Sequence, residues 1–314
     1  MDNITIDKYT IEPTNADKLF FPESGVTKGD LINYYAKIAD VMLPHVQGRP
    51  ITMHRFPDGL EDEGFFQKSV PDYFPDWIDR VTVDTRTDGE QTMAVCNNAA
   101  ALVYLANQAC ITPHIWLSRV DRIDFPDKMV FDLDPTRDDF LPIRAAATEL
   151  RTILDDELGL TSFLMTTGSK GLHIVVPLDR SADFEDVMSF AQSVAAVATD
   201  RHPELFTTEQ RIENRNAPIY LDIARNAYGQ TSVSPYAVRA LSAAPIATPV
   251  NWDELGDIIS AQTFTIWNIE SRLNEVGDPW EGIWNQVCSL DEAQDMLDVL
   301  FSEVATGDDM TGIS

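Results

Sequence analysis

Residues 128–135, with the sequence KMVFDLDP, constrain the fold of this chain most, because they combine a strand pattern with two acidic residues. Alternate residues of a strand share a face, so Phe131 and Leu133 can enter a core while Asp132 and Asp134 point together to the other side. Carboxylates at i and i+2 lie about 7 Å apart by the strand rise and suit a hard divalent cation. The Asp-x-Asp pattern alone favours two solvated aspartates at a strand end. The residues that follow later in the chain are what make a metal-binding strand the expectation.

A third acidic strand residue follows later in the chain. Residues 217–224 alternate so that Ile219, Leu221 and Ile223 face inward and Asp222 faces outward. Three strand carboxylates can hold two divalent ions, and such a pair can activate a hydroxyl and neutralise a phosphate leaving group. We therefore predict that Asp132, Asp134 and Asp222 are catalytic metal ligands.

A tight turn, Gly168-Ser-Lys-Gly171, joins the expected strands 161–167 and 172–178. Its glycines let the backbone approach a phosphate closely, while Ser169 offers a hydrogen-bond donor and Lys170 a charge. Strand alternation puts His173 on the polar side, within reach of the same ligand. The turn is not a Walker A loop, and a simple glycine hairpin is the alternative.

The net charge of −28 argues against a nucleic-acid binder, because duplex-binding proteins usually carry a basic surface. The acidity is uneven: residues 241–314 contain 14 Asp and Glu and one arginine, which accounts for −13 and leaves −15 for the rest. Recognition through a phosphate pocket and base stacking needs few cations, so the objection is not decisive.

Composition narrows the class further. A hydrophobic fraction of 44% indicates a folded globular protein, and three scattered cysteines indicate neither a disulfide framework nor a zinc site. There is no apolar run of membrane-spanning length and no signal-peptide pattern, so we expect a cytoplasmic protein that does not enter a membrane.

The N-terminal part predicts a DNA-facing surface. Thr27 and Asp30 form a capping pattern for a helix that we expect to end at Pro44. Phe65 and Phe66 are adjacent in a predicted strand, so at least one ring should be exposed beside Lys68 and could stack on an unpaired base. Core packing is the commoner fate of a phenylalanine.

We also expect hairpin strands over 78–95 around a turn at 87–90, a strand over 231–239 that ends in Arg239, and a helix from Ser289. Further helices are predicted over 98–109, 140–158, 183–201 and 264–273.

The order of these motifs resembles the archaeo-eukaryotic primase superfamily, and more closely the polymerase domain of DNA ligase D. The resemblance covers about residues 13–285. It rests on Phe-Asp-Leu-Asp-Pro (131–135), Gly-Ser-Lys-Gly-Leu-His (168–173), Tyr-Leu-Asp (220–222) and Ser-Pro-Tyr-Ala-Val-Arg (234–239), and on Gly-Arg-Pro-Ile-Thr (48–52), Phe-Phe-Gln-Lys (65–68), Trp-Leu-Ser-Arg (116–119) and Gly-Asp-Pro-Trp (277–280).

The resemblance implies a template-dependent polymerase that prefers ribonucleotides, uses Mn²⁺ or Mg²⁺, accepts NTP or dNTP substrates and fills short gaps in non-homologous end joining. It implies that the incoming nucleotide is bound by His114, Ser169, Lys170, His173 and Arg239. It implies that DNA is bound by Asn15, Lys18 and Lys28 at a 5′-phosphate, by Phe65 and Phe66 at the template, and by Arg215 at the primer end. A separate ATP-dependent DNA ligase and Ku are the expected partners.

The expected fold is mixed α/β (α+β), with a central, mostly antiparallel catalytic sheet flanked by helices and an N-terminal subdomain. We expect one catalytic domain over 1–306, divided into a DNA-binding part (about 1–115), a core (about 116–245) and an acidic helical part (about 246–306), with a disordered tail at 307–314. A manganese-dependent Asp-x-Asp glycosyltransferase is the alternative function, and an inactive end-binding module is a third. Neither the third aspartate strand nor the N-terminal lysines are expected of a glycosyltransferase.

Overall fold

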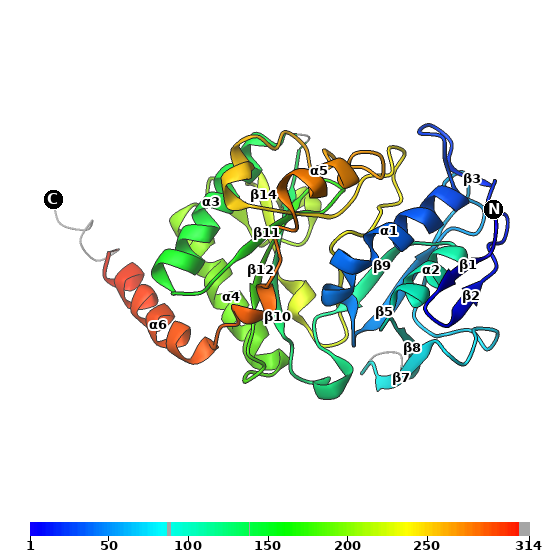
Figure 1. Ribbon diagram of the computed structural model, residues 1–314. Coiled ribbons are helices and arrows are strands. Elements are labelled where there is room, and N and C mark those ends of the chain that lie inside the picture. Colours follow the sequence, from blue (N-terminus) through cyan, green and yellow to red (C-terminus); the bar gives the residue numbers. More distant parts are fainter. Residues whose placement is uncertain (87–88, 138, 308–314) are drawn as a thin grey trace.

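Alternating apolar residues organise the chain into two six-stranded sheets, which stand side by side in the computed structural model (Figure 1). The structure describes residues 1–86, 89–137 and 139–307, with side chains up to residue 300. The first sheet, here called the aspartate sheet, has the strand order β13-β14-β10-β12-β11-β16. The second, the N-terminal sheet, has the order β15-β9-β5-β8-β7, with β6 paired to β5. The predicted mixed α/β architecture is confirmed.

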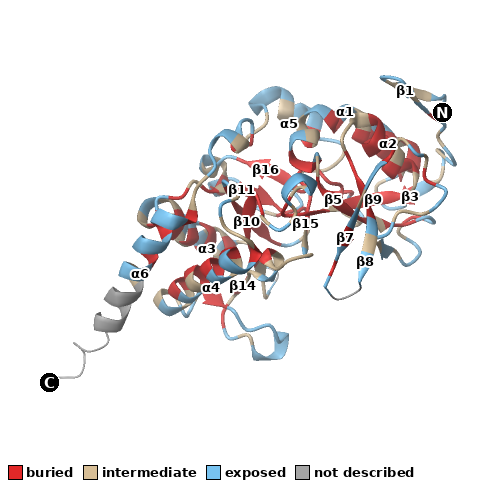
Figure 2. Cartoon of the chain, turned by 90° about the horizontal axis from the view of Figure 1, so that it is seen from below, coloured by how far each residue is buried: buried red, intermediate tan, exposed pale blue. Residues whose placement is uncertain are grey.

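The aspartate sheet is antiparallel except for one parallel pair, β13 with β14. Its central strand β10 alternates as predicted, with Met129, Phe131 and Leu133 in a core that α3, α4 and the first half of α6 cover. Figure 2 shows the buried residues of this sheet in β10, β11 and β16. The elements are β10 (Lys128–Pro135), β11 (Phe163–Thr166), β12 (Leu172–Pro177), β13 (Phe206–Thr207), β14 (Ile219–Asp222), β16 (Thr248–Val250), α3 (Leu141–Arg151), α4 (Phe184–Arg201) and α6 (Leu290–Gly307).

The N-terminal sheet packs against α1 and α2, whose buried residues join a second core. The capping box of Thr27 and Asp30 at the start of α1 is formed as predicted. The elements are β5 (Pro50–Arg55), β6 (Phe65–Gln67), β7 (Asp79–Asp84), β8 (Glu90–Val95), β9 (Cys110–Trp116), β15 (Thr231–Val233), α1 (Lys28–Val46) and α2 (Ala99–Asn107). Two small hairpins, β1 (Ile4–Ile6) with β2 (Tyr9–Ile11) and β3 (Leu19–Phe21) with β4 (Val26–Thr27), and the helix α5 (Ile269–Val276) complete this half.

The two halves share the second core. Val130, Met165 and Val175 lie on the opposite face of the aspartate sheet from Phe131, and they pack with the N-terminal half. The same face carries Asp132, two residues after Val130. This face of the aspartate sheet is therefore apolar at one end, where the two halves are joined, and polar at the other end.

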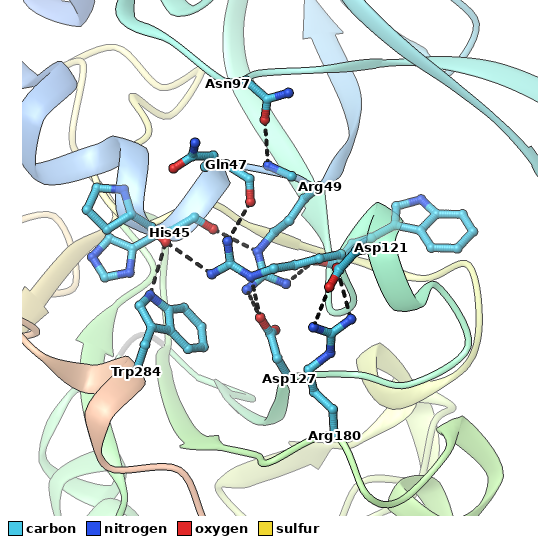
Figure 3. A network of polar contacts seen from close by, with 12 residues as sticks. His45, Gln47, Arg49, Asn97, Asp121, Asp127, Arg180 and Trp284 are labelled. Carbon is cyan, nitrogen blue, oxygen red and sulfur yellow. Dashed lines mark hydrogen bonds and ion pairs between the residues drawn. The ribbon is translucent and has the colours of Figure 1, made fainter.

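A buried arginine also joins the halves (Figure 3). Arg49 is fully buried and donates from Nη2 to Asp127 Oδ2 at 2.6 Å and from Nε to the His45 carbonyl at 2.8 Å. Arg119 donates to the same Asp127 oxygen at 2.7 Å, and both guanidinium groups lie over the Trp284 ring. The network connects the last turn of α1, the residues directly before β5 and β10, and the C-terminal segment.

Three local predictions are wrong. Helix α1 continues past Pro44 to Val46, because a proline in the last turn removes only one hydrogen bond. The strand expected over 231–239 ends at Val233, two residues before Pro235, which has no N–H to donate to a sheet. The helix expected to begin near Phe264 begins at Ile269.

Other predictions fall partly on undescribed residues. Residues 87–88 of the expected hairpin turn, and residues 308–314 of the expected disordered tail, lie outside the described parts of the chain. Strands β7 and β8 on either side of the turn pair antiparallel as predicted. In the described residues, none of the helices has the length and apolar content needed to cross a membrane.

Candidate active site

The register of two neighbouring strands, β10 and β14, brings the three predicted aspartates together. Asp132 on β10 lies opposite Asp222 on β14, and Asp134 follows two residues later on the same face of β10. One carboxylate oxygen from each residue can be chosen so that the three atoms lie within 4.8 Å of one another. The structure therefore gathers all three predicted metal ligands at one point.

This cluster fits a hard divalent cation. Asp132 is 5% exposed, and its buried Oδ1 has no hydrogen-bond partner among the described residues. Leaving a buried carboxylate oxygen unpaired is costly, and a metal ion would satisfy it. The donor set of three carboxylates is the one that Mg²⁺ and Mn²⁺ prefer.

The electrostatics separate the two aspartates of β10. Burial, and then the negative charge of Asp132, raise the pKa of Asp134 to about 6. Burial would also raise the pKa of Asp132, but the charge and hydrogen bond of His173, with Arg225 and Arg239, lower it below its usual value. Asp132 is therefore ionised at neutral pH. Repulsion from its charge makes ionisation of Asp134 less favourable.

His173 is held against Asp132 by the sheet itself. The two residues are directly opposite in the β10–β12 pairing, and His173 Nε2 lies 3.3 Å from Asp132 Oδ2. His173 is 4% exposed, so its ring is fixed in this position. The predicted location of His173 on the polar side of β12 is confirmed.

A cavity adjoins the aspartates and contains most of the residues predicted for the nucleotide. Four of the five predicted residues line it, and Lys170 is exposed on the neighbouring turn without lining it. Asp132 and Asp134 form one side of the same cavity. The lining residues predicted from the sequence are His114, Ser169, His173 and Arg239, and those not predicted are Thr167, Arg225, Thr231 and Val233.

The glycine turn owes its shape to close packing. Gly168 has φ +65°, and a Cβ atom there would lie 2.8 Å from Arg239 Cγ. A Cβ atom on Gly171 would lie 2.3 Å from the Leu133 carbonyl oxygen, on the aspartate strand itself. Thr167 Oγ1 accepts from the Gly171 N–H at 3.1 Å and closes the turn. Both glycines are therefore required for Ser169 to sit beside the carboxylates.

Arg239 and His114 face this cavity from the N-terminal half. Arg239 donates from Nη1 to the Thr167 carbonyl, which ties it to the base of the glycine turn. Burial, then the charges of Arg239 and His54, lower the pKa of His114 to about 3. His114 is therefore neutral at physiological pH and can act as a hydrogen-bonding group without adding charge.

The two predicted stacking residues are both exposed, Phe65 by 45% and Phe66 by 60%. The sequence required only one of them to be exposed, but among the described strands β6 pairs only with β5, and both rings stay partly exposed. Phe66 stacks on His54 with ring centroids 4.1 Å apart and contacts the His114 ring edge-on at 5.4 Å. The exposed aromatic surface therefore begins at the cavity. His54 was not predicted to belong to the site, because one histidine within the strand β5 matches no sequence motif.

The three N-terminal residues predicted for a 5′-phosphate are also brought together. The Lys28 N–H donates to the Lys18 carbonyl at 2.8 Å, and the Lys18 N–H donates to the Asn15 carbonyl at 3.0 Å. Burial, then the charges of Lys18 and Arg55, lower the pKa of Lys28 to about 8. Lys18 also forms an ion pair with Asp58, which was not predicted.

Arg215 lies beside the aspartates on an exposed loop that contains the short 3₁₀ turn Ile212–Asn214. Its guanidinium packs over the Tyr220 ring at 3.8 Å and donates from Nε to the Glu209 carbonyl at 3.0 Å. Tyr220 is the residue opposite Asp134 in the sheet. Arg215 is therefore near the metal cluster but outside the cavity.

Comparisons with known proteins agree with this arrangement. A sequence model of the family described as LigD, primase-polymerase domain matches residues 27–280. The Bifunctional non-homologous end joining protein LigD of Bacillus subtilis is 36% identical over 269 residues, covering 85% of this chain and 43% of that protein. The Multifunctional non-homologous end joining protein LigD of Mycolicibacterium smegmatis is 33% identical over 268 residues, covering 84% of this chain and 35% of that protein. The chain thus spans less than half the length of these relatives.

A solved structure is similar over most of the chain. It is the polymerase domain from Mycobacterium tuberculosis Ligase D in complex with DNA, with a TM-score of 0.83 and 31% sequence identity. The match covers 88% of this chain and 99% of that chain. The fold that the sequence motifs predicted is confirmed.

Proposed function

Since this chain belongs to the LigD primase-polymerase domain family, and is thereby a nucleotidyltransferase of the polymerase type, we propose that it fills short gaps at broken DNA ends in non-homologous end joining. It would extend a primer on a template, with a preference for ribonucleotides. The observation that supports this most directly is the cluster of three carboxylates beside a cavity lined by Ser169, His173 and Arg239.

Asp132, Asp134 and Asp222 would hold Mn²⁺ or Mg²⁺, which would supply the positive charge that activates the primer 3′-hydroxyl and neutralises the leaving pyrophosphate. His173 keeps Asp132 ionised and oriented across the β10–β12 pair. Ser169, Lys170, Arg239 and the neutral His114 would bind the incoming nucleotide, because phosphoryl transfer depends mainly on positioning and charge stabilisation.

DNA recognition would use few cations, in keeping with the acidic chain. Asn15, Lys18 and Lys28 would bind the 5′-phosphate at the far side of a gap, where the charged Lys28 is already buried. Phe65 and Phe66 would stack on unpaired template bases, since base stacking on exposed rings is insensitive to sequence. Arg215 would contact the primer end.

We further propose that residues 1–306 act as one catalytic domain in the cytoplasm, together with a separate ATP-dependent DNA ligase and Ku. Nothing in the comparisons favours the glycosyltransferase alternative. The second core contains Val130, Met165 and Val175 of the aspartate sheet together with buried residues of α1, α2 and the N-terminal sheet, which supports one unit over several.

The test is extension of a labelled primer on gapped DNA with Mn²⁺ and either NTPs or dNTPs, at low and high salt. Wild type, Asp132→Ala and Lys18→Ala are compared, on gaps with and without the 5′-phosphate. Templated addition should be lost in Asp132→Ala. In Lys18→Ala it should weaken only when the phosphate is present. Absence of addition by the wild type in every condition would overturn the proposal.

A further inference from the structure

Arg225 lies among the carboxylates although no prediction assigned it a role. It belongs to the 3₁₀ turn Ala224–Asn226, which begins two residues after the end of β14 at Asp222. Its Nε lies 3.6 Å from Asp132 Oδ2, and it lines the same cavity as Arg239. The aspartate cluster therefore has a permanent positive charge at its edge.

The backbone under Arg225 is fixed, whereas its side chain is partly exposed. The Ala224 N–H donates to Asp222 Oδ1 at 2.8 Å. Asn226 is fully buried, and its amide group pairs with both backbone groups of Val130 at 2.8 and 2.7 Å. The Arg225 side chain itself is 41% exposed. The guanidinium can thus exchange one partner for another without movement of the turn.

A guanidinium beside Asp132 opposes a divalent cation at the same carboxylates. The repulsion between a single and a double positive charge about 6 Å apart, screened as in water, changes an affinity on the order of tenfold. Asp132 is the carboxylate most affected, because its Oδ2 lies within ion-pair distance of the guanidinium, at 3.6 Å. A phosphate group entering the cavity would offer the guanidinium an alternative partner, since arginine pairs well with phosphate oxygens.

We propose that Arg225 is the counter-ion of Asp132, and that it makes metal binding depend on the arrival of the nucleotide. It weakens metal binding to the empty cluster and then pairs with the triphosphate, so each ligand strengthens the binding of the other. Such coupling is reciprocal by thermodynamic necessity. The inference rests on the proposed function of the aspartate cluster.

The experiment is a Mn²⁺ titration of the full chain, followed by the paramagnetic resonance signal of unbound Mn²⁺. It compares wild type, Arg225→Ala, Arg225→Lys and Asp132→Ala. Each is titrated alone and with a non-hydrolysable ribonucleoside triphosphate, with the nucleotide–Mn²⁺ complex measured separately. Arg151→Ala is the matched control, because Arg151 is 46% exposed and pairs with Asp155 at 3.3 Å away from the cavity. Circular dichroism verifies that each variant is folded.

Without nucleotide, Arg225→Ala should bind Mn²⁺ about tenfold more tightly than the wild type, while Arg225→Lys and Arg151→Ala stay within twofold of it. The gain in Mn²⁺ affinity on adding nucleotide should shrink in Arg225→Ala by a similar factor. If Arg225→Ala binds Mn²⁺ no more tightly than the wild type, the inference is wrong and the metal site stands. If the wild type binds no more Mn²⁺ than Asp132→Ala, the metal site of the proposed function fails, and the inference fails with it.

Discussion

At the scale of single residues, Asp134 connects the metal cluster to protein stability. Its raised pKa, about 6, means that the folded protein binds this proton more tightly than the unfolded chain does. Ionised Asp134 therefore destabilises the metal-free fold as pH rises from about 4 through 6, and has no effect below about pH 4, where both states are protonated.

Asp134→Asn should accordingly stabilise the metal-free protein by about 3 kcal/mol at pH 7.5 and leave it unchanged at pH 4. Urea unfolding in the presence of a chelator measures this difference, with the exposed Asp156→Asn as control for the loss of one charge. Addition of Mn²⁺ should reverse the order and make the wild type the more stable protein. An equal gain at both pH values would contradict the assignment.

A second prediction concerns Lys18, whose ammonium is paired with Asp58 and donates to the Pro57 carbonyl at 2.9 Å. This exposed ion pair competes with a DNA phosphate. Asp58→Asn should tighten binding of gapped DNA that carries a 5′-phosphate by roughly two- to fivefold, because exposed ion pairs are weak. Fluorescence anisotropy measures this, and DNA without the phosphate should show a smaller gain. An equal gain in affinity for both DNAs would contradict the prediction, because it would be explained by the loss of one negative charge anywhere on the surface.

At the scale of secondary-structure elements, the strands that carry the aspartates were predictable and their ends were not. Strand alternation predicted the faces of Phe131, Asp132 and His173 because each lies in a regular strand with a buried side. Arg225 and Thr231 escaped prediction because they lie in a turn and at a strand end, where the side-chain direction depends on tertiary packing. The Asp58 ion pair depends on two loops and has no periodic signal.

Asn226 is the element-scale feature that no pattern could predict. Its side-chain amide continues the sheet beside Val130 after β14 has ended at Asp222. Asn226→Ala should lower the free energy of unfolding by about 2–4 kcal/mol, because two buried backbone groups lose their partners. Chemical denaturation measures this. The exposed cap variant Asn251→Ala should cost about 1 kcal/mol, and an equal loss in both would contradict the special role of Asn226.

At the scale of the whole molecule, the Arg49–Asp127 pair holds the two halves together. Arg49, with Arg119, lowers the pKa of the buried Asp127 although burial alone would raise it. Its stabilisation is therefore present above about pH 4, the usual value for Asp, and is lost as pH falls through the lowered pKa.

Asp127→Asn should destabilise the protein by about 3–5 kcal/mol at pH 7, because it leaves Arg49 charged and buried without its partner. Asp121→Asn, which breaks the more exposed pair with Arg180, should cost no more than about 1 kcal/mol. Thermal and urea unfolding of both variants decide the comparison. The prediction fails if the two losses are equal.

The sequence did not predict that the two halves share one hydrophobic core. The expected parts at about 1–115 and 116–245 divide the chain by order, but β15 returns to the N-terminal sheet and β16 joins the aspartate sheet. A strand pairs with a sheet formed much earlier in the chain because residues far apart in the sequence come into contact. One such contact is the hydrogen bond that the Tyr34 hydroxyl donates to the Tyr236 carbonyl at 2.7 Å. A local pattern carries no record of such contacts.

The position of β15 has a consequence during protein synthesis. Strand β9 leaves the ribosome as the edge of an unfinished sheet, and its partner β15 is made more than a hundred residues later. At the usual ~5–20 residues per second, that edge stays uncovered for roughly 6 to 25 s. An apolar edge strand is a template for pairing with other chains. The nascent chain is thus most vulnerable to aggregation before translation reaches residue 233. The rate of translation between β9 and β15 therefore affects the yield of folded protein.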